Sequence, residues 1–258
     1  MLKIRHNAGF FSCCNIVLLT VIGYFNKEEK LPIDIDCSQT FNKYKKDEDK
    51  NTDVMDHFFS YNEEIEINFH KPIVITTENS EDQFSNYKML HVSDIHPFIR
   101  KYFSPSPEII NIKTELLKKY NVDTSKCISV YYRGTDKLRE TQLGDFNKYY
   151  DKIASLKNDD SQIVIQTDAK PFLDYMKSKY PDCICFDENK VSNKIYGIHN
   201  ENTNNVNYND IKYLFATFLI MAESKHLVMS SGNCSLWMTY YRGHVDNIYQ
   251  CLHNSFLQ

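Results

Sequence analysis

The segment 127–137 constrains this chain more than any other. It begins with Cys-Ile-Ser-Val-Tyr-Tyr, an apolar, β-branched and aromatic run that is typical of a buried strand. The run passes directly into Arg133, Gly134, Asp136 and Lys137. Ligands of open α/β sheets bind beyond the carboxyl ends of the strands, and an arginine fork fits a phosphate. Gly134 would let the backbone approach a ligand. The segment therefore predicts an anion site, with a solvated turn as the alternative.

The order of the expected elements predicts an α/β fold. A strand at 1–5, a helix at 13–30 with Ser12 as its N-cap and a strand at 33–36 form a β–α–β unit. Pro105 and Pro107 punctuate a linker, which divides the chain into domains 1–105 and 106–258. The other expected strands are 66–69, 72–76, 127–132, 162–166, 182–186, 226–229 and 245–249, and the other expected helices are 108–120, 146–155 and 210–223.

Polar residues follow two further strands of the second domain. Asp168 comes just after strand 162–166 and is expected to hold a donor sugar or an arginine, or else to cap the next helix. Strand 226–229 leads into a small polar loop and the start of a helix, where free N–H groups and the helix dipole favour an anion. That loop consists of Ser230, Ser231, Gly232, Asn233, Cys234 and Ser235.

The motif Tyr-Tyr-Arg-Gly-Thr-Asp-Lys at 131–137 resembles the His-x-Arg-Arg-Thr-Asp-Lys signature of α1,6-fucosyltransferases. Other segments follow in that family's order, including Gln-Thr-Asp at 166–168 and Gly-Ile-His-Asn at 197–200, so the similarity covers roughly 98–240. The resemblance implies a GT-B-like fold, with two Rossmann-like domains facing a cleft. It also implies an inverting, metal-independent transfer of fucose from GDP-fucose to a glycan hydroxyl.

The resemblance implies roles for individual residues. Arg133 would clamp the β-phosphate with help from Lys137, and Asp136 would orient Arg133 or the loop backbone. The general base of the family is a Glu eight positions after the Arg, where this chain has Thr141, so Glu140 is the candidate base. The residues expected to contact the donor are Gly9, Tyr131, Gly134, Lys137, Asp168, His199 and the six residues of the 230–235 loop.

Three positions depart from the family pattern. Tyr131 replaces its His, Gly134 replaces its second Arg, and Thr217 stands where the family has an Asp that contacts the base. These changes would be compatible with a different nucleotide sugar, with weaker donor binding or with a degenerate enzyme. A non-catalytic relative that binds a nucleotide sugar or a glycan is therefore an alternative function.

Two short acidic motifs suggest metal ions. Asp94 and His96 resemble the strand-Asp-x-His motif of calcineurin-type metallophosphoesterases, although the downstream blocks of that family are missing. Asp34 and Asp36 form an Asp-x-Asp triplet, which is common by chance. We predict no metal site and no cofactor besides the donor, and keep a metal-dependent phosphoesterase as a lesser alternative.

Composition limits the partners. A net charge of −4 does not favour nucleic acid or an anionic membrane. The eight cysteines include no Cys-x-x-Cys pair and mostly lie in apolar segments, which predicts reduced thiols and a cytoplasmic location. The apolar run 13–25 is shorter than the ~20 residues that cross a bilayer, so we expect no membrane span. The expected partners are a nucleotide sugar and a glycan or glycoconjugate acceptor.

Overall fold

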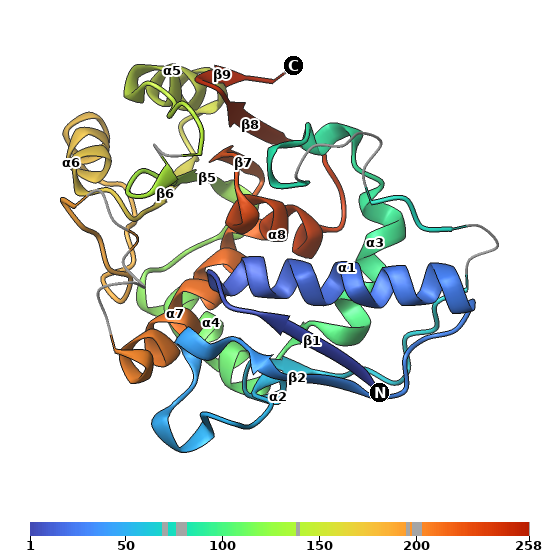
Figure 1. The fold of residues 1–258 in the computed structure, drawn as a ribbon. Helices are drawn as coiled ribbons and strands as arrows, with labels where there is room; N and C mark the ends of the chain where they lie inside the picture. Colours follow the sequence, from blue (N-terminus) through green and yellow to red (C-terminus); the bar gives the residue numbers. More distant parts are fainter. Residues whose placement is uncertain (69–71, 76–81, 138–139, 195–196, 198–202, 258) are drawn as a thin grey trace.

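The computed structural model describes all residues except 69–71, 76–81, 138–139, 195–196, 198–202 and 258. The chain folds into an α/β structure (Figure 1). Its largest sheet is mainly parallel. The predicted α/β class is confirmed.

The main sheet belongs to the C-terminal part of the chain. Its strand order is β6-β5-β7-β8-β9, and every neighbouring pair is parallel except β8 and β9. Because β5, β6 and β7 are parallel neighbours, their carboxyl ends meet at one edge. The strands are β5 (Cys127–Tyr132), β6 (Gln162–Thr167), β7 (His226–Ser230), β8 (Ile248–Leu252) and β9 (Ser255–Phe256). The expected strand at 182–186 is reduced to an isolated bridge between Ile184 and Val164.

The N-terminal part contains the predicted β–α–β unit. It consists of β1 (Leu2–His6), α1 (Phe10–Glu28) and β2 (Ile35–Thr40), with β1 parallel to β2. The expected N-cap was wrong: Gly9 occupies that position, because Phe10 and Phe11 already lie in the helix and are buried. Ser12 instead hydrogen-bonds Nε2 of His6 at 3.0 Å.

Shorter elements connect the two parts. Residues 66–68 and 72–75 form no strand, so the strands expected at 66–69 and 72–76 are wrong over these positions. Positions 69 and 76 lie outside the described residues. A separate two-stranded antiparallel sheet consists of β3 (Phe59–Ser60) and β4 (Ser104–Pro105). The remaining helices are α2 (Met55–Phe58), α3 (Val92–Tyr102), α4 (Pro107–Lys119), α5 (Phe146–Leu156), α6 (Lys170–Lys179), α7 (Asn204–Ala222) and α8 (Asn233–Arg242), and the 3-10 turns are η1 (Asn42–Tyr44), η2 (Asp47–Asp49), η3 (Asp82–Phe84), η4 (Tyr87–Met89) and η5 (Thr124–Lys126).

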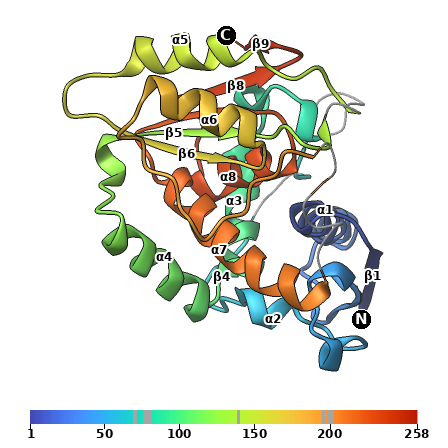
Figure 2. The ribbon, with the colours of Figure 1, turned by 90° about the vertical axis from the view of Figure 1, so that its left-hand side faces the viewer.

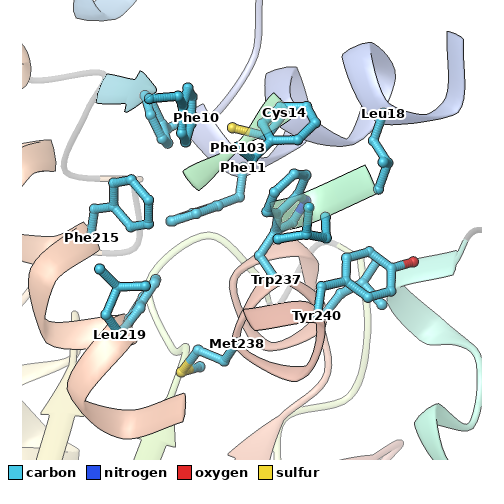
Figure 3. Packing of buried hydrophobic residues seen from close by; sticks show 14 of the residues in the cluster. Phe10, Phe11, Cys14, Leu18, Phe103, Phe215, Leu219, Trp237, Met238 and Tyr240 are labelled. Atoms are coloured by element: carbon cyan, nitrogen blue, oxygen red, sulfur yellow. The ribbon is translucent and has the colours of Figure 1, made fainter. Parts of the chain in front are cut away.

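Two apolar clusters cover the two faces of the main sheet. Helices α5 and α6 pack on the face that carries Ile128 and Val130 (Figure 2). The opposite face belongs to a larger cluster that extends without interruption into α1. In Figure 3, Phe11 of α1 lies close to Trp237 of α8, and their ring centroids are 6.0 Å apart. The core therefore crosses residue 105, and the division into two domains stays a prediction.

Helix α1 is long and apolar enough to cross a membrane by length and composition alone. Its residues Cys14, Val17 and Leu18 are fully buried in the core of the protein. A buried core helix passes the same test, so the expectation of no membrane span stays a prediction.

Candidate functional site

A cavity of about 450 Å³ lies where the carboxyl edge of the main sheet faces the β1–α1 loop. Both halves of the chain line it, as expected for two α/β units that face a cleft. The predicted site residues along its wall are Gly9, Tyr131, Arg133, Asp136, Lys137, Glu140, Asp168, Ser231, Gly232, Asn233 and Cys234. Gly134, Ser230 and Ser235 lie behind the wall, and His199 lies outside the described residues.

Arg133 occupies the centre of this wall, directly after β5. Its Nε and Nη2 atoms donate to Asp136 at 2.8–3.0 Å, and Nε lies 3.0 Å from Oδ2 of Asp168. Within the described part of the chain, these contacts involve Nε and Nη2 and not the Nη1 amino group. Burial disfavours the charge of Arg133, but the carboxylates outweigh this effect and raise its pKa well above the usual value. The site thus holds a permanent cation in a fixed orientation.

Asp168 organises the loop after β5. Its Oδ1 accepts from the Gly134 N–H at 2.7 Å, and its Oδ2 accepts from the Thr135 hydroxyl at 2.6 Å. Together with the ion pair to Arg133, these bonds use most of its acceptor capacity. Of the predicted roles, Asp168 therefore holds the arginine. The capping alternative was wrong, since the N-cap of α6 is Ala169 without a side-chain bond.

The surroundings of Gly134 leave no room for a side chain. A Cβ atom at this position would lie 2.7 Å from Cβ of Ala169 and 2.8 Å from Cε1 of Tyr132. Any larger residue, including the arginine of the signature, would require the neighbouring atoms to shift. Gly134 thus serves close packing behind the site.

The 230–235 loop joins β7 to the N-terminus of α8. Gly232 has φ 151° and ψ 169°, a conformation that is essentially restricted to glycine. No side chain caps α8, so its first-turn N–H groups lack intrahelical acceptors and favour an anion. Ser230 instead accepts from the Arg133 N–H at 3.0 Å, and the Ser235 hydroxyl donates to the Ser230 carbonyl. These two serines stabilise the loop from behind.

Lys137 and Glu140 stand beside this loop. Nζ of Lys137 forms an ion pair with Oε2 of Glu140 and donates to Oε1 of Gln83 at 3.1 Å. A Cβ atom on Gly232 would lie 3.3 Å from Cε of Lys137, so the lysine lies directly over the loop. Arg133, Lys137 and the start of α8 therefore converge on one region of the cavity.

Sequence reasoning missed the opposite end of the cavity. There Nδ2 of Asn189 donates to Oε1 of Gln166 and to Oγ1 of Thr217, each at 2.8 Å. Asp210 forms an ion pair with Lys190 at 2.8 Å, and both residues line the cavity. Asp210 precedes Thr217 by two helical turns and so lies on a similar face of α7. The carboxylate of Asp210 within the apolar segment of α7 was the sequence signal that could have identified this end of the cavity.

The two suggested metal motifs lie elsewhere. The expected strand before Asp94 was wrong: Asp94 and His96 belong to α3, and Nδ1 of His96 contacts the Tyr240 carbonyl at 2.9 Å. Asp36 accepts from the Ser38 N–H at 2.9 Å and does not line the cavity. In the part of the chain that the structure describes, no three or more His, Cys, Asp or Glu residues are grouped as metal ligands.

Comparison with known proteins finds distant structural likeness but no match in sequence. No protein-family model matches the chain, and no curated protein matches it in sequence. Its structure is similar to a crystal structure of the NodZ α1,6-fucosyltransferase soaked with GDP-fucose, with a TM-score of 0.45 and 13% identity. The match covers 66% of this chain and 54% of the NodZ chain, so this chain spans about half the length of that enzyme.

Proposed function

We propose that this chain is a glycosyltransferase that transfers fucose from GDP-fucose to a glycan hydroxyl, with inversion and without a metal ion. The arrangement around Arg133 carries the proposal. A partly buried arginine, oriented by two carboxylates, lines the cavity together with the uncapped start of α8. Fixed donors of this kind suit the diphosphate of a nucleotide sugar, whose charge grows as the sugar leaves.

The transfer needs one base and one stabilised leaving group. Glu140 would accept the proton of the acceptor hydroxyl while that oxygen forms a bond to C1 of the sugar. The bond from C1 to the phosphate oxygen breaks at the same time, and the diphosphate leaves. Arg133 and Lys137 would neutralise its charge. An entering diphosphate would compete with Glu140 for Lys137, which would release the carboxylate for this role.

The end of the cavity near α7 suits the nucleobase. Guanine presents an N–H and an exocyclic amino group side by side, and a carboxylate can accept both. Asp210, which pairs with Lys190, and Glu188, which pairs with Lys119, are carboxylates at this end. Asn189 and Gln166 add amide groups on the neighbouring wall. Asp210 could thus supply the acidic contact that Thr217 cannot make, which supports GDP over UDP in the proposal.

Thermal stabilisation by nucleotides tests the proposal. A ligand that binds the folded state at roughly 100 times its Kd stabilises it by about 2.7 kcal/mol. We expect GDP and GDP-fucose to raise the Tm without Mn²⁺, and UDP and UDP-glucose to have little effect. Arg133→Ala should remove the shift, whereas Arg100→Ala, an exposed arginine of α3, should keep it.

Other outcomes of the same experiment would contradict the proposal. A Tm shift with UDP ligands alone would indicate a UDP-sugar donor instead of GDP-fucose. A Tm shift with Mn²⁺ alone would favour metal-dependent chemistry. A GDP shift that survives Arg133→Ala would show that the diphosphate binds elsewhere.

A further inference from the structure

Gln83 reaches the cavity from a segment to which sequence analysis gave no function. It lies in η3, between the N-terminal β–α–β unit and α3. Its side-chain carbonyl accepts from Nζ of Lys137 at 3.1 Å, and the residue lines the cavity. The N-terminal part of the chain thus contributes a neutral amide next to Lys137 and Glu140.

The backbone that carries Gln83 is fixed to the loop after β7. The buried Tyr87 hydroxyl accepts from the Gly232 N–H at 3.0 Å and lies 2.8 Å from the Gln83 carbonyl. Gln250, which is also buried, accepts from the Tyr87 N–H and donates to the Ser85 carbonyl and to the Ser231 hydroxyl, all at 2.8 Å. Gln83 therefore has a defined position relative to the proposed diphosphate site.

The order of residues along the cavity decides what Gln83 would contact. Asn189 bonds to Gln166 of β6 and to Thr217 of α7, and Arg133 follows β5, which lies between β6 and β7. Gln83 bonds to Lys137, which lies over Gly232 after β7. In a nucleotide sugar, the diphosphate separates the base from the sugar. If the base lies near α7 and the diphosphate at Arg133, the sugar lies at the Gln83 end, where the proposed general base also stands.

We infer that Gln83 binds the sugar of the donor and helps to select it; this inference rests on the proposed function. A side-chain amide offers both a donor and an acceptor, which complements sugar hydroxyl groups. It adds no charge that would compete with Arg133 for the diphosphate. Gln83 is thus a specificity residue that contacts the transferred group, whereas Tyr87 and Gln250 position it.

Titration calorimetry with GDP and GDP-fucose separates sugar binding from diphosphate binding. Gln83→Ala should raise the Kd for GDP-fucose about three- to tenfold, the range expected for one or two lost hydrogen bonds, and leave the Kd for GDP unchanged. Gln83→Met, which keeps the length of the side chain, should behave in the same way. Gln39→Ala, at an exposed glutamine of β2, should change neither value.

The two proposals fail in different ways. If the Kd values for GDP and GDP-fucose rise together, or if neither changes, the inference about Gln83 is wrong and the proposed function stands. If the unmodified protein binds neither compound, the proposed function is wrong. The proposed contact between Gln83 and the donor sugar is then wrong as well.

Discussion

Arg133 stays charged throughout the pH range in which proteins fold. Burial alone would lower the pKa of Arg133, but the carboxylates of Asp168 and Asp136 raise it. The same carboxylates orient the guanidinium, since two of its nitrogens donate to them. A diphosphate that binds at Nη1 would therefore meet an arginine that needs no further ordering, which reduces the entropic cost of binding.

If the chain is an enzyme, Glu140 takes part in the proton transfer, whereas Arg133 binds the diphosphate. Glu140→Gln removes the proposed base but keeps the size of the side chain. We expect turnover, measured as GDP release from GDP-fucose with a pool of glycan acceptors, to fall by about 10²–10⁴. The Kd for GDP should stay the same or decrease, because Lys137 loses its carboxylate partner.

Glu115→Gln provides the matched control, because Glu115 is exposed on α4 and does not line the cavity. Full turnover in Glu140→Gln would assign the base to another residue. If the unmodified protein binds GDP but shows no turnover, the alternative of a non-catalytic binding relative is favoured instead.

At the scale of elements, the edge of the main sheet could be predicted. The apolar runs that became β5, β6 and β7 each pass directly into polar residues, and parallel strands bring such ends together. Arg133, Asp168 and Ser231 were therefore expected near one another, and all three line the cavity. Which of them bond to one another depends on side-chain distances, which a strand pattern does not contain.

The elements between β2 and α4 could not be predicted in the same way. Residues 82–89 form two short 3-10 turns, which have too few residues to show a hydrophobic period. The resemblance of residues 89–96 to a strand-Asp-x-His motif suggested a strand before Asp94, yet α3 begins at Val92 and contains Pro97. Gln83 was missed because contacts distant in sequence, such as Tyr87 with Gly232, place its segment.

The attachment of this segment predicts the effect of Tyr87→Phe. The change removes the hydroxyl that accepts from the Gly232 N–H and leaves that buried group without its partner. Such a loss costs about 1–3 kcal/mol and should lower the Tm by several degrees. The Kd for GDP should rise as well, because the loop before α8 becomes less ordered.

Tyr61→Phe is the matched control for Tyr87→Phe. It also removes a tyrosine hydroxyl, but from a side chain that is 54% exposed. It should leave both the Tm and the Kd for GDP unchanged. A Tyr87→Phe protein with an unaltered Tm would mean that the segment is held by Gln250 and apolar packing alone.

At the scale of the whole molecule, the apolar core joins the two parts that the sequence suggested were separate domains. Rings from α1 and from Phe103 pack on Trp237 of α8, and the Phe103 and Trp237 centroids are 4.9 Å apart. Separating the two parts would expose these rings to water, at about 25 cal/mol for each Å² of apolar surface. We therefore expect that neither part is stable alone.

The continuous core predicts one cooperative unfolding transition in scanning calorimetry. Because the cavity is lined from both parts, GDP should move the whole transition to a higher temperature. Two separate transitions, with only the later one sensitive to GDP, would instead show that 1–105 and 106–258 are independent domains. Phe103→Ala provides a second test. It removes a fully buried ring at the junction and should lower the single Tm without splitting the transition, since the same packed surface stabilises both parts.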